Sequence, residues 1–235
     1  MDKRILHIEN LSKSFGGLRL FDKVNINLHQ GTINSLFGGN GSGKTTFFNL
    51  ISGYVKPDSG KIHFNGMTIK FHNEFAIANA GIGKMWQVPT VFPNHTVSEN
   101  LMVSDKTHPG EKFLNYIFNR KSIKEKESEL KEKSFAVLQK FKLMGKERQL
   151  AGSLSLGERK LLSISMLLMN EAQLLLLDEP FSGVNSDTVE RISKTLVELR
   201  DEGKTIFMIE HKIKFAEVIS DCLFKIENYK INKLN

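Results

Sequence analysis

The hydrophobic pattern along the chain alternates between short apolar runs, which predict strands, and apolar residues at helical spacing, which predict helices. Strands are predicted at residues 5–8, 24–28, 33–37, 61–64, 67–69, 174–177 and 205–209. Helices are predicted at residues 45–51, 158–169 and 186–202, and a helical insert rich in lysine and glutamate begins near residue 113. The Asn65-Gly66 dipeptide predicts a hairpin between two of the early strands.

The order of these elements predicts the fold class. The early strands favour an antiparallel sheet, whereas strand and helix alternate later, which indicates a parallel sheet with helices on both faces. The 235 residues, 40% of them hydrophobic, are enough to build a substantial core. We therefore predict an α/β protein with an N-terminal antiparallel β subdomain and an inserted α-helical subdomain.

The charge and the cysteine content narrow the possible partners and the possible structural classes of the protein. The 33 Lys and Arg against 26 Asp and Glu give a net charge of +7, which favours an acidic partner such as nucleic acid, a phosphorylated ligand or a membrane surface. Residues 106–148 hold 12 Lys and Arg and 6 Asp and Glu, so most of the excess lies in the helical insert. The single cysteine, Cys222, excludes a disulfide framework. We expect no signal peptide and no membrane-spanning segment.

A phosphate-binding loop follows the strand at residues 33–37. Residues 38–45 read Gly-Gly-Asn-Gly-Ser-Gly-Lys-Thr, which fits G-x-x-x-x-G-K-[ST] between a strand and a helix. In this motif the backbone N–H groups surround phosphate oxygens, Lys44 reaches the β- and γ-phosphates, and Thr45 ligates Mg²⁺. The strand at residues 174–177 ends in Asp178 and Glu179, which suit the Mg²⁺ shell and the attacking water respectively.

Further short motifs appear in a definite order after the loop. They are Met85-Trp86-Gln87, Leu154-Ser155-Leu156-Gly157-Glu158, Ser182-Gly183-Val184-Asn185 and Ile209-Glu210-His211. Together with the loop and the acidic strand end, they make the sequence resemble the ATP-binding subunits of ABC transporters over nearly the whole chain. The resemblance implies a single domain with a P-loop NTPase core of the ABC ATPase type at residues 1–92 and 160–235. Residues 93–159 would then form the helical subdomain that carries the signature motif, residues 154–158.

The resemblance also implies ATP and Mg²⁺ as ligands and assigns roles to residues. Phe15 would stack on adenine, Gln87 would sense the membrane partner, and His211 would hold the geometry of the γ-phosphate. The implied catalytic residues are Glu179, His211 and Lys44; the metal ligands are Thr45, Gln87 and Asp178; and the nucleotide contacts are Phe15, Gly38, Gly39, Asn40, Gly41, Ser42, Gly43, Lys44, Thr45, Thr46, Ser155 and Gly157.

The signature motif implies a partner. The Ser155 hydroxyl and the N–H groups that follow it form a second anion site at a helix start, which in the family meets the γ-phosphate held by another subunit. We therefore expect an ATP-sandwiched dimer with a second copy or a similar ATPase subunit. The resemblance further implies integral membrane permease subunits as partners, no nucleic acid partner, and a peripheral location on the cytoplasmic side of the inner cell membrane, with membrane contact through partners.

Departures from the usual signature narrow the subfamily. Leu156 stands where Gly is usual and is tolerable if its backbone angle is ordinary, and Glu158 stands where Gln is usual. A residue other than glycine at that position and a long helical insert are typical of importers of branched-chain amino acids and of urea or amides. The alternatives are the ATPase of a lipopolysaccharide or lipid exporter, a soluble ABC ATPase outside transport, and a scaffold that binds ATP without hydrolysing it.

Overall fold

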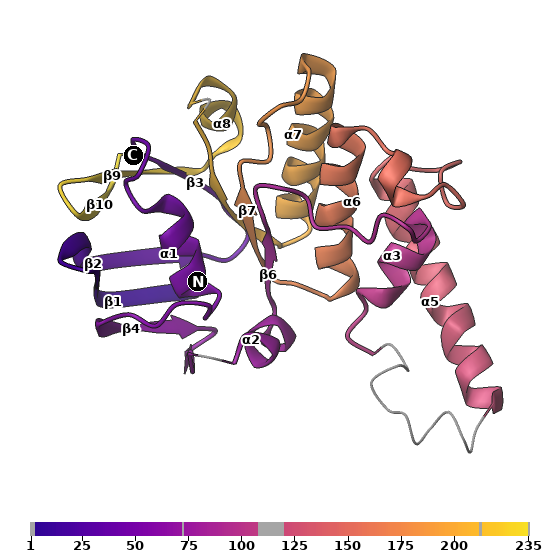
Figure 1. Ribbon diagram of the computed structural model, residues 1–235, viewed down its shortest axis with the longest axis horizontal. Coiled ribbons are helices and arrows are strands. Elements are labelled where there is room, and N and C mark those ends of the chain that lie inside the picture. Colours follow the sequence, from indigo (N-terminus) through magenta and orange to yellow (C-terminus); the bar gives the residue numbers. More distant parts are fainter. Residues whose placement is uncertain (1–2, 72, 108–119, 212, 235) are drawn as a thin grey trace.

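Two sheets organise the chain in the computed structural model, which describes residues 3–71, 73–107, 120–211 and 213–234. One sheet is antiparallel and N-terminal, and the other is mainly parallel and carries helices on both faces (Figure 1). The predicted α/β class with an antiparallel N-terminal sheet is confirmed.

The antiparallel sheet has the strand order β2, β1, β4, β5. Its strands are β1 (Arg4–Phe15), β2 (Leu18–His29), β4 (Ser59–Phe64) and β5 (Met67–Thr68). Ile8 lies opposite both Ile26 and Ile62, so the sheet has an apolar, buried face. Asn65 and Gly66 join β4 to β5 with φ angles of 48° and 79°, and the predicted hairpin is confirmed.

The parallel sheet has the strand order β10, β9, β3, β8, β7, β6, in which only β10 pairs antiparallel. Its strands are β3 (Ile33–Phe37), β6 (Ile82–Met85), β7 (Leu174–Asp178), β8 (Thr205–Ile209), β9 (Cys222–Glu227) and β10 (Lys230–Lys233). Every residue of β3, β7 and β8 is buried, which explains their continuous apolar sequence. The hydrophobic pattern did not predict β6, β9 or β10, because their apolar runs are short or interrupted by polar residues.

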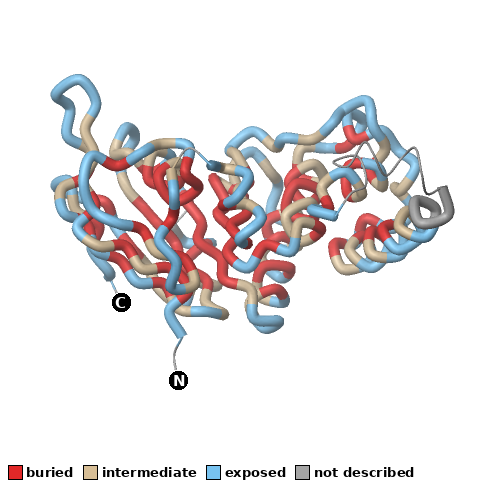
Figure 2. Tube along the Cα trace, turned by 90° about the horizontal axis from the view of Figure 1, so that it is seen from below, coloured by how far each residue is buried: buried red, intermediate tan, exposed pale blue. Residues whose placement is uncertain are grey.

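Alternate residues of β7 separate two hydrophobic cores. The helices are α1 (Lys44–Ile51), α2 (Glu74–Ala80), α3 (Val97–Val103), α5 (Arg120–Lys140), α6 (Leu156–Met169), α7 (Ser186–Asp201) and α8 (Ile213–Ile219). Leu174 and Leu176 share a core with α1, α2 and the antiparallel sheet. Leu175 and Leu177 share the other core with α6, α7 and α8. Figure 2 shows the buried residues concentrated along the central strands and the helices against them. Helices α1 and α6 thus pack on opposite faces.

The structure agrees with only part of the prediction for the helical subdomain at residues 93–159. Helix α5 confirms the predicted insert, whereas residues 113–119 of that prediction lie outside the described residues. Helix α3 was not predicted, although it begins with a capping box between Thr96 and Glu99, a spacing that is visible in the sequence. The predicted subdomain boundary at residue 160 falls inside α6, and the division into subdomains stays a prediction.

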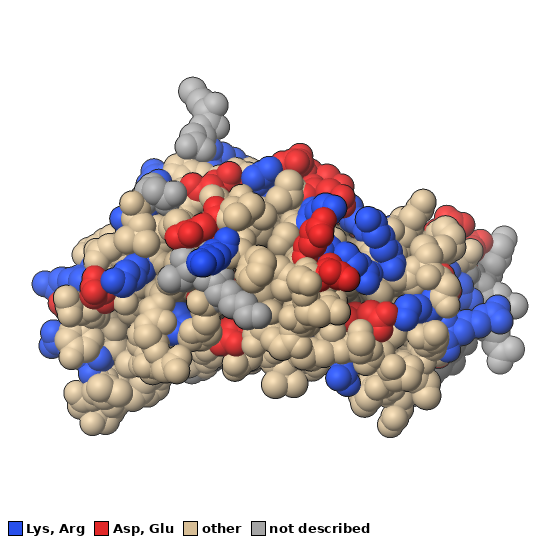
Figure 3. All heavy atoms as spheres, turned by 90° about the horizontal axis from the view of Figure 1, so that it is seen from above, with Lys and Arg blue, Asp and Glu red and all other residues tan. Residues whose placement is uncertain are grey.

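Lysines of α5 bind groups on neighbouring elements, both in the helical part and in the core. The Lys133 Nζ atom donates to Asp105 Oδ2 at 2.5 Å and to the Met169 carbonyl at 3.0 Å, and Lys140 pairs with Glu202. Positive and negative side chains are interspersed on the face seen in Figure 3. Part of the positive charge of the insert therefore ties α5 to the core. Within the described ranges, no helix is long and apolar enough to cross a bilayer.

Candidate functional site

The loop at residues 38–43 joins buried strand β3 to α1. Gly41 and Gly43 have φ angles of 76° and 95°, in the left-handed region that favours glycine. A Cβ atom on Gly43 would lie 3.0 Å from the Phe21 ring, so this position also lacks room for a side chain. The loop tip at Gly39 and Asn40 is exposed. A glycine-rich loop that leads into a helix N-terminus in this way is suited to binding phosphate.

Lys44 and Ser42 line this loop. The Lys44 side chain is buried, and its Nζ atom donates to the carbonyl oxygens of Gly38 and Gly39 at 2.9 and 3.0 Å. Burial lowers the pKa of Lys44, while the nearby carboxylates of the strand end act in the opposite direction. The Ser42 Oγ atom is buried and has no hydrogen-bond partner in the part of the chain that the structure describes. A phosphate in the loop would supply an acceptor to both side chains.

Thr45 and Asp178 bring two oxygen ligands together beside the loop. Thr45 Oγ1 donates to Asp178 Oδ2 at 3.2 Å. Asp178 ends β7 and is 2% exposed. Burial raises the pKa of Asp178, although the Thr45 hydrogen bond and the Lys84 charge lower it. A hydroxyl and a desolvated carboxylate are ligands that Mg²⁺ prefers, so these residues fit the predicted metal.

Glu179 and His211 lie together at the ends of neighbouring strands. Glu179 has a φ angle of 51°, which is uncommon for a residue with a side chain. Its N–H group donates to the Ile209 carbonyl at 3.0 Å, and its Oε1 atom lies 3.0 Å from His211 Nε2. The structure therefore brings together two of the residues predicted to catalyse.

Gln87 and Phe15 are not joined to this cluster. Gln87 is exposed and lies two residues after β6, which pairs with β7 along the same sheet edge. Phe15 ends β1, is 48% exposed, and has its ring centroid 4.8 Å from Lys13 Nζ. Among the described residues, no hydrogen bond or ring contact links either side chain to the phosphate loop. Their roles stay predictions.

Ser155 caps the N-terminus of α6. Its hydroxyl oxygen accepts the Glu158 N–H group, and its own N–H and O–H groups donate to Glu158 Oε2, both at 2.9 Å. Lys146 Nζ lies 2.6 Å from Glu158 Oε1. Partial burial would raise the pKa of Glu158, but the hydrogen bonds from Lys146 and Ser155 lower it to about 2. No described contact joins Ser155 or Gly157 to the phosphate loop, and α1, which follows that loop, packs on the face of the sheet opposite α6.

The first turn of α6 packs closely on the segment that follows Glu179. Leu156 has an ordinary helical backbone, and its Cδ2 atom lies 2.9 Å from where a Cβ atom on Gly183 would stand. A Cβ atom on Gly157 would lie 2.5 Å from Thr188 Cγ2. Gly157 is therefore required by the close approach of α6 and α7, whatever its contact with a ligand.

Two buried charged residues were not predicted as part of the site. Lys160 is 1% exposed, and its Nζ atom donates to the carbonyl oxygens of Glu179 and Ser182. Glu210 is 2% exposed and accepts the Phe181 N–H group. The signal in the sequence was a lysine directly before the mainly apolar run of α6, and a lysine there does not reveal main-chain partners on a distant segment.

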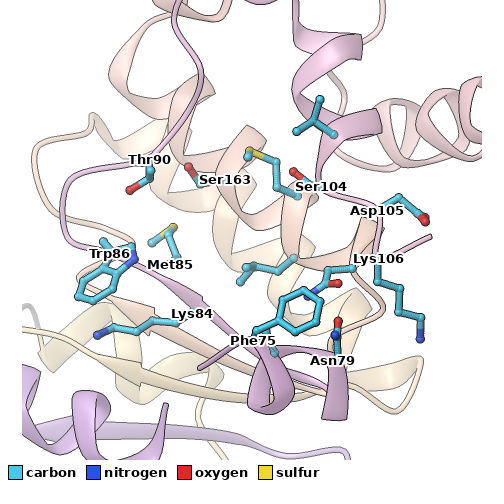
Figure 4. Close-up of a pocket in the computed structure, with 15 residues that line it drawn as sticks. Phe75, Asn79, Lys84, Met85, Trp86, Thr90, Ser104, Asp105, Lys106 and Ser163 are labelled. Carbon is cyan, nitrogen blue, oxygen red and sulfur yellow. The ribbon is translucent and has the colours of Figure 1, made fainter. Parts of the chain in front are cut away.

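A cavity of about 340 Å³ lies beside the end of β6, with walls from α2, α3 and α6 (Figure 4). Its lining mixes apolar and polar side chains, among them Phe75, Trp86, Ser104 and Asp105. The Lys84 ammonium lies 3.5 Å from the centroid of the Trp86 ring. It also donates to the side-chain oxygen of Asn49 on α1. The residue that precedes Gln87 is thus held against the core.

Comparisons with known proteins agree with this geometry. A family model described as ABC transporter matches residues 21–182. The "Probable branched-chain amino acid transport ATP-binding protein LivG" of Archaeoglobus fulgidus is 36% identical over 225 residues, which are 96% of this chain and 86% of that protein. The high-affinity branched-chain amino acid transport ATP-binding protein LivG of Escherichia coli K12 is 30% identical over 96% of this chain and 89% of that protein.

Solved structures of ATP-binding cassettes are also similar to this chain. A nucleotide-free ATP-binding cassette from an ABC transporter superposes with a TM-score of 0.82 at 34% identity and covers 97% of this chain and 90% of that one. The ADP conformation of an ATP-binding cassette gives a TM-score of 0.83 at 35% identity, with 98% and 90% covered. The chain therefore belongs to the ABC transporter family, as an ATP-binding protein. It is an ATPase that drives transport, and its homologues are ATPases of branched-chain amino acid transport.

Proposed function

We propose that this chain powers the import of branched-chain or related amino acids through a membrane permease. Similarity at 30–36% identity to branched-chain amino acid transport ATP-binding proteins, over nearly the whole chain, carries the proposal. Leu156 in the signature and the long helical insert agree with it. The exporter alternative is weaker because its signature is usually glycine-rich and its insert shorter.

Within the chain, we assign Phe15 to adenine, residues 38–46 to the phosphates, and Thr45, Gln87 and Asp178 to Mg²⁺. Bound Mg²⁺ would neutralise charge on the phosphates. The Glu179 carboxylate orients the attacking water, and His211 Nε2, 3.0 Å from Glu179 Oε1, helps to hold the carboxylate in place. We also assign the exposed His211 ring to the γ-phosphate. Catalysis of this kind is mostly positioning and charge stabilisation.

A second subunit completes the site in this proposal. Ser155 and Gly157 start α6, which packs on the face of the sheet opposite α1, so they serve the nucleotide of another subunit. That subunit is a second copy or a similar ATPase, and ATP lies between the two.

The cavity beside Trp86 is the proposed contact for an integral membrane permease. Its wall includes Met85 and Trp86, immediately before Gln87, so a permease segment placed there would act on the metal ligand. Its mixed apolar and polar lining suits the end of an amphipathic helix. Membrane contact comes through this partner, which places the chain at the cytoplasmic side of the inner cell membrane.

Purification of the tagged chain from membranes, followed by identification of the proteins that co-elute, tests this function. We expect a permease and a similar ATPase, and uptake of labelled leucine that stops when Glu179 is replaced by Gln. Co-elution of a lipid-export permease would favour the exporter. Recovery of ribosomal proteins without a permease would overturn the transport function.

A further inference from the structure

Lys160 is buried in the signature helix, and its ammonium donates to main-chain carbonyl oxygens. It lies one turn after Leu156 and is 1% exposed. A buried ammonium is costly unless its donors are satisfied. The acceptors that satisfy this ammonium are therefore part of what keeps it buried.

Two acceptors of Lys160 are main-chain carbonyl oxygens in the turn at residues 179–182. The Nζ atom lies 2.6 Å from the Glu179 oxygen and 2.7 Å from the Ser182 oxygen. The turn is closed by the Ser182 N–H group, which donates to the Glu179 carbonyl at 3.2 Å. Because Glu179 has a φ angle of 51°, the turn stores backbone strain that the surrounding structure must hold.

Glu210 holds the same turn from the other side. Its Oε1 atom accepts the Phe181 N–H group at 2.7 Å. Its own N–H group donates to the Leu36 carbonyl at 3.3 Å, which ties it to the strand before the phosphate loop. Burial raises the pKa of Glu210 to about 7, and the Lys160 charge acts against this rise. A buried ammonium group and a buried carboxyl group thus hold the turn between α6 and the end of β8.

We propose that Lys160 is a positioning residue for hydrolysis, which fixes the turn at residues 179–182 so that the Glu179 carboxylate stays aligned with His211. The proposal rests on the assigned role of Glu179. Leu156 packs against Gly183, directly after this turn, and Gly157 packs against Thr188 of α7, so the first turn of α6 is in close contact with the chain that follows the turn.

The double variant Lys160→Met with Glu210→Gln tests the proposal, because removing both charges leaves no unpaired buried ion. Lys204→Met is the matched control, since Lys204 Nζ is partly buried and donates to the Ala172 carbonyl at 2.8 Å, in another part of the fold. We expect the double variant to bind ATP within about threefold of the wild-type Kd while kcat falls about 10- to 100-fold. Amide exchange at residues 181–182 should accelerate, and the control should change neither quantity.

A folded double variant with kcat within about twofold of wild type would overturn the proposal, as would loss of ATP binding in parallel with turnover. If the methionine variant does not fold, Lys160→Gln with Glu210→Gln keeps an amide donor and is judged by the same criteria. A wild-type chain without ATP hydrolysis would instead contradict the proposed function. In that case faster exchange at residues 181–182 in the variant alone still supports the positioning role, and unchanged exchange refutes it.

Discussion

His211 Nε2 lies 3.0 Å from Glu179 Oε1, so that the two side chains meet at the ends of neighbouring strands. The pairing of β7 with β8 sets this distance, because Asp178 lies opposite Ile209 and the Glu179 N–H group donates to the Ile209 carbonyl. The main chain and the side chain of Glu179 are thus both held by the end of β8.

Replacing Glu179 by Gln should stop turnover while ATP still binds. The amide keeps the size of the side chain but loses the charge that orients and polarises water, and general-base contributions of about 10²- to 10⁴-fold are typical. Phosphate release measures turnover, and light scattering with ATP is expected to show a trapped dimer. Near-normal turnover would show that Glu179 has another role.

Replacing Lys44 by Ala should weaken ATP binding by at least about 100-fold, because the ammonium is the charged ligand of the phosphates in this loop. Titration with a fluorescent ATP analogue measures the Kd. Lys56→Ala, which removes an exposed lysine outside the loop, is the control. Equal affinity of the two variants would remove Lys44 from the site.

Replacing Gly157 by Ala should destabilise the fold by about 1–3 kcal/mol, because the new Cβ atom would lie 2.5 Å from Thr188 Cγ2. Thr188→Ala removes that methyl group and should restore part of the loss in the double variant. Urea denaturation of the four proteins gives the coupling energy. Additive effects would show that the contact does not exclude a side chain at Gly157.

Replacing Glu158 by Gln should let the ATP dimer form at several-fold lower ATP concentration. The carboxylate accepts both Ser155 donors and places a negative charge where a partner's phosphate would approach. Light scattering in the Glu179→Gln background gives the ATP threshold. Glu99→Gln alters the same kind of capping box in α3 and should affect stability alone. An unchanged or higher threshold for Glu158→Gln contradicts this interpretation.

Replacing Glu210 by Gln should flatten the pH dependence of stability. The pKa of Glu210 is raised from 4.5 to about 7 by burial, so the folded state binds the proton more tightly than the unfolded chain does. Its stabilising contribution is full below pH 4.5 and is lost as the pH rises through 7, on the order of 3 kcal/mol in total. Urea unfolding from pH 5 to 8 should show a steeper fall for wild type, and parallel curves would be the contrary result.

Much of the site could be predicted from the sequence because its motifs are local. The phosphate loop needs glycines at Gly41 and Gly43 for the left-handed backbone and a lysine directly after them, and all of these are contiguous. The strands with continuous apolar runs were also predictable, since every residue of β3, β7 and β8 is buried. Short or mixed elements such as β6 and β10 were not, because their apolar residues form no clear period.

The sequence by itself determined the α/β class, the loop, the acidic end of β7 and the family, because these depend on residue type at fixed spacing. Only the tertiary structure decided which distant groups meet. It joined His211 to Glu179, seated Gly157 against Thr188, and directed Lys160 to the carbonyl oxygens of Glu179 and Ser182. The physical reason is that carbonyl groups and close van der Waals contacts carry no signature in the sequence. They acquire partners only when strands and helices pack.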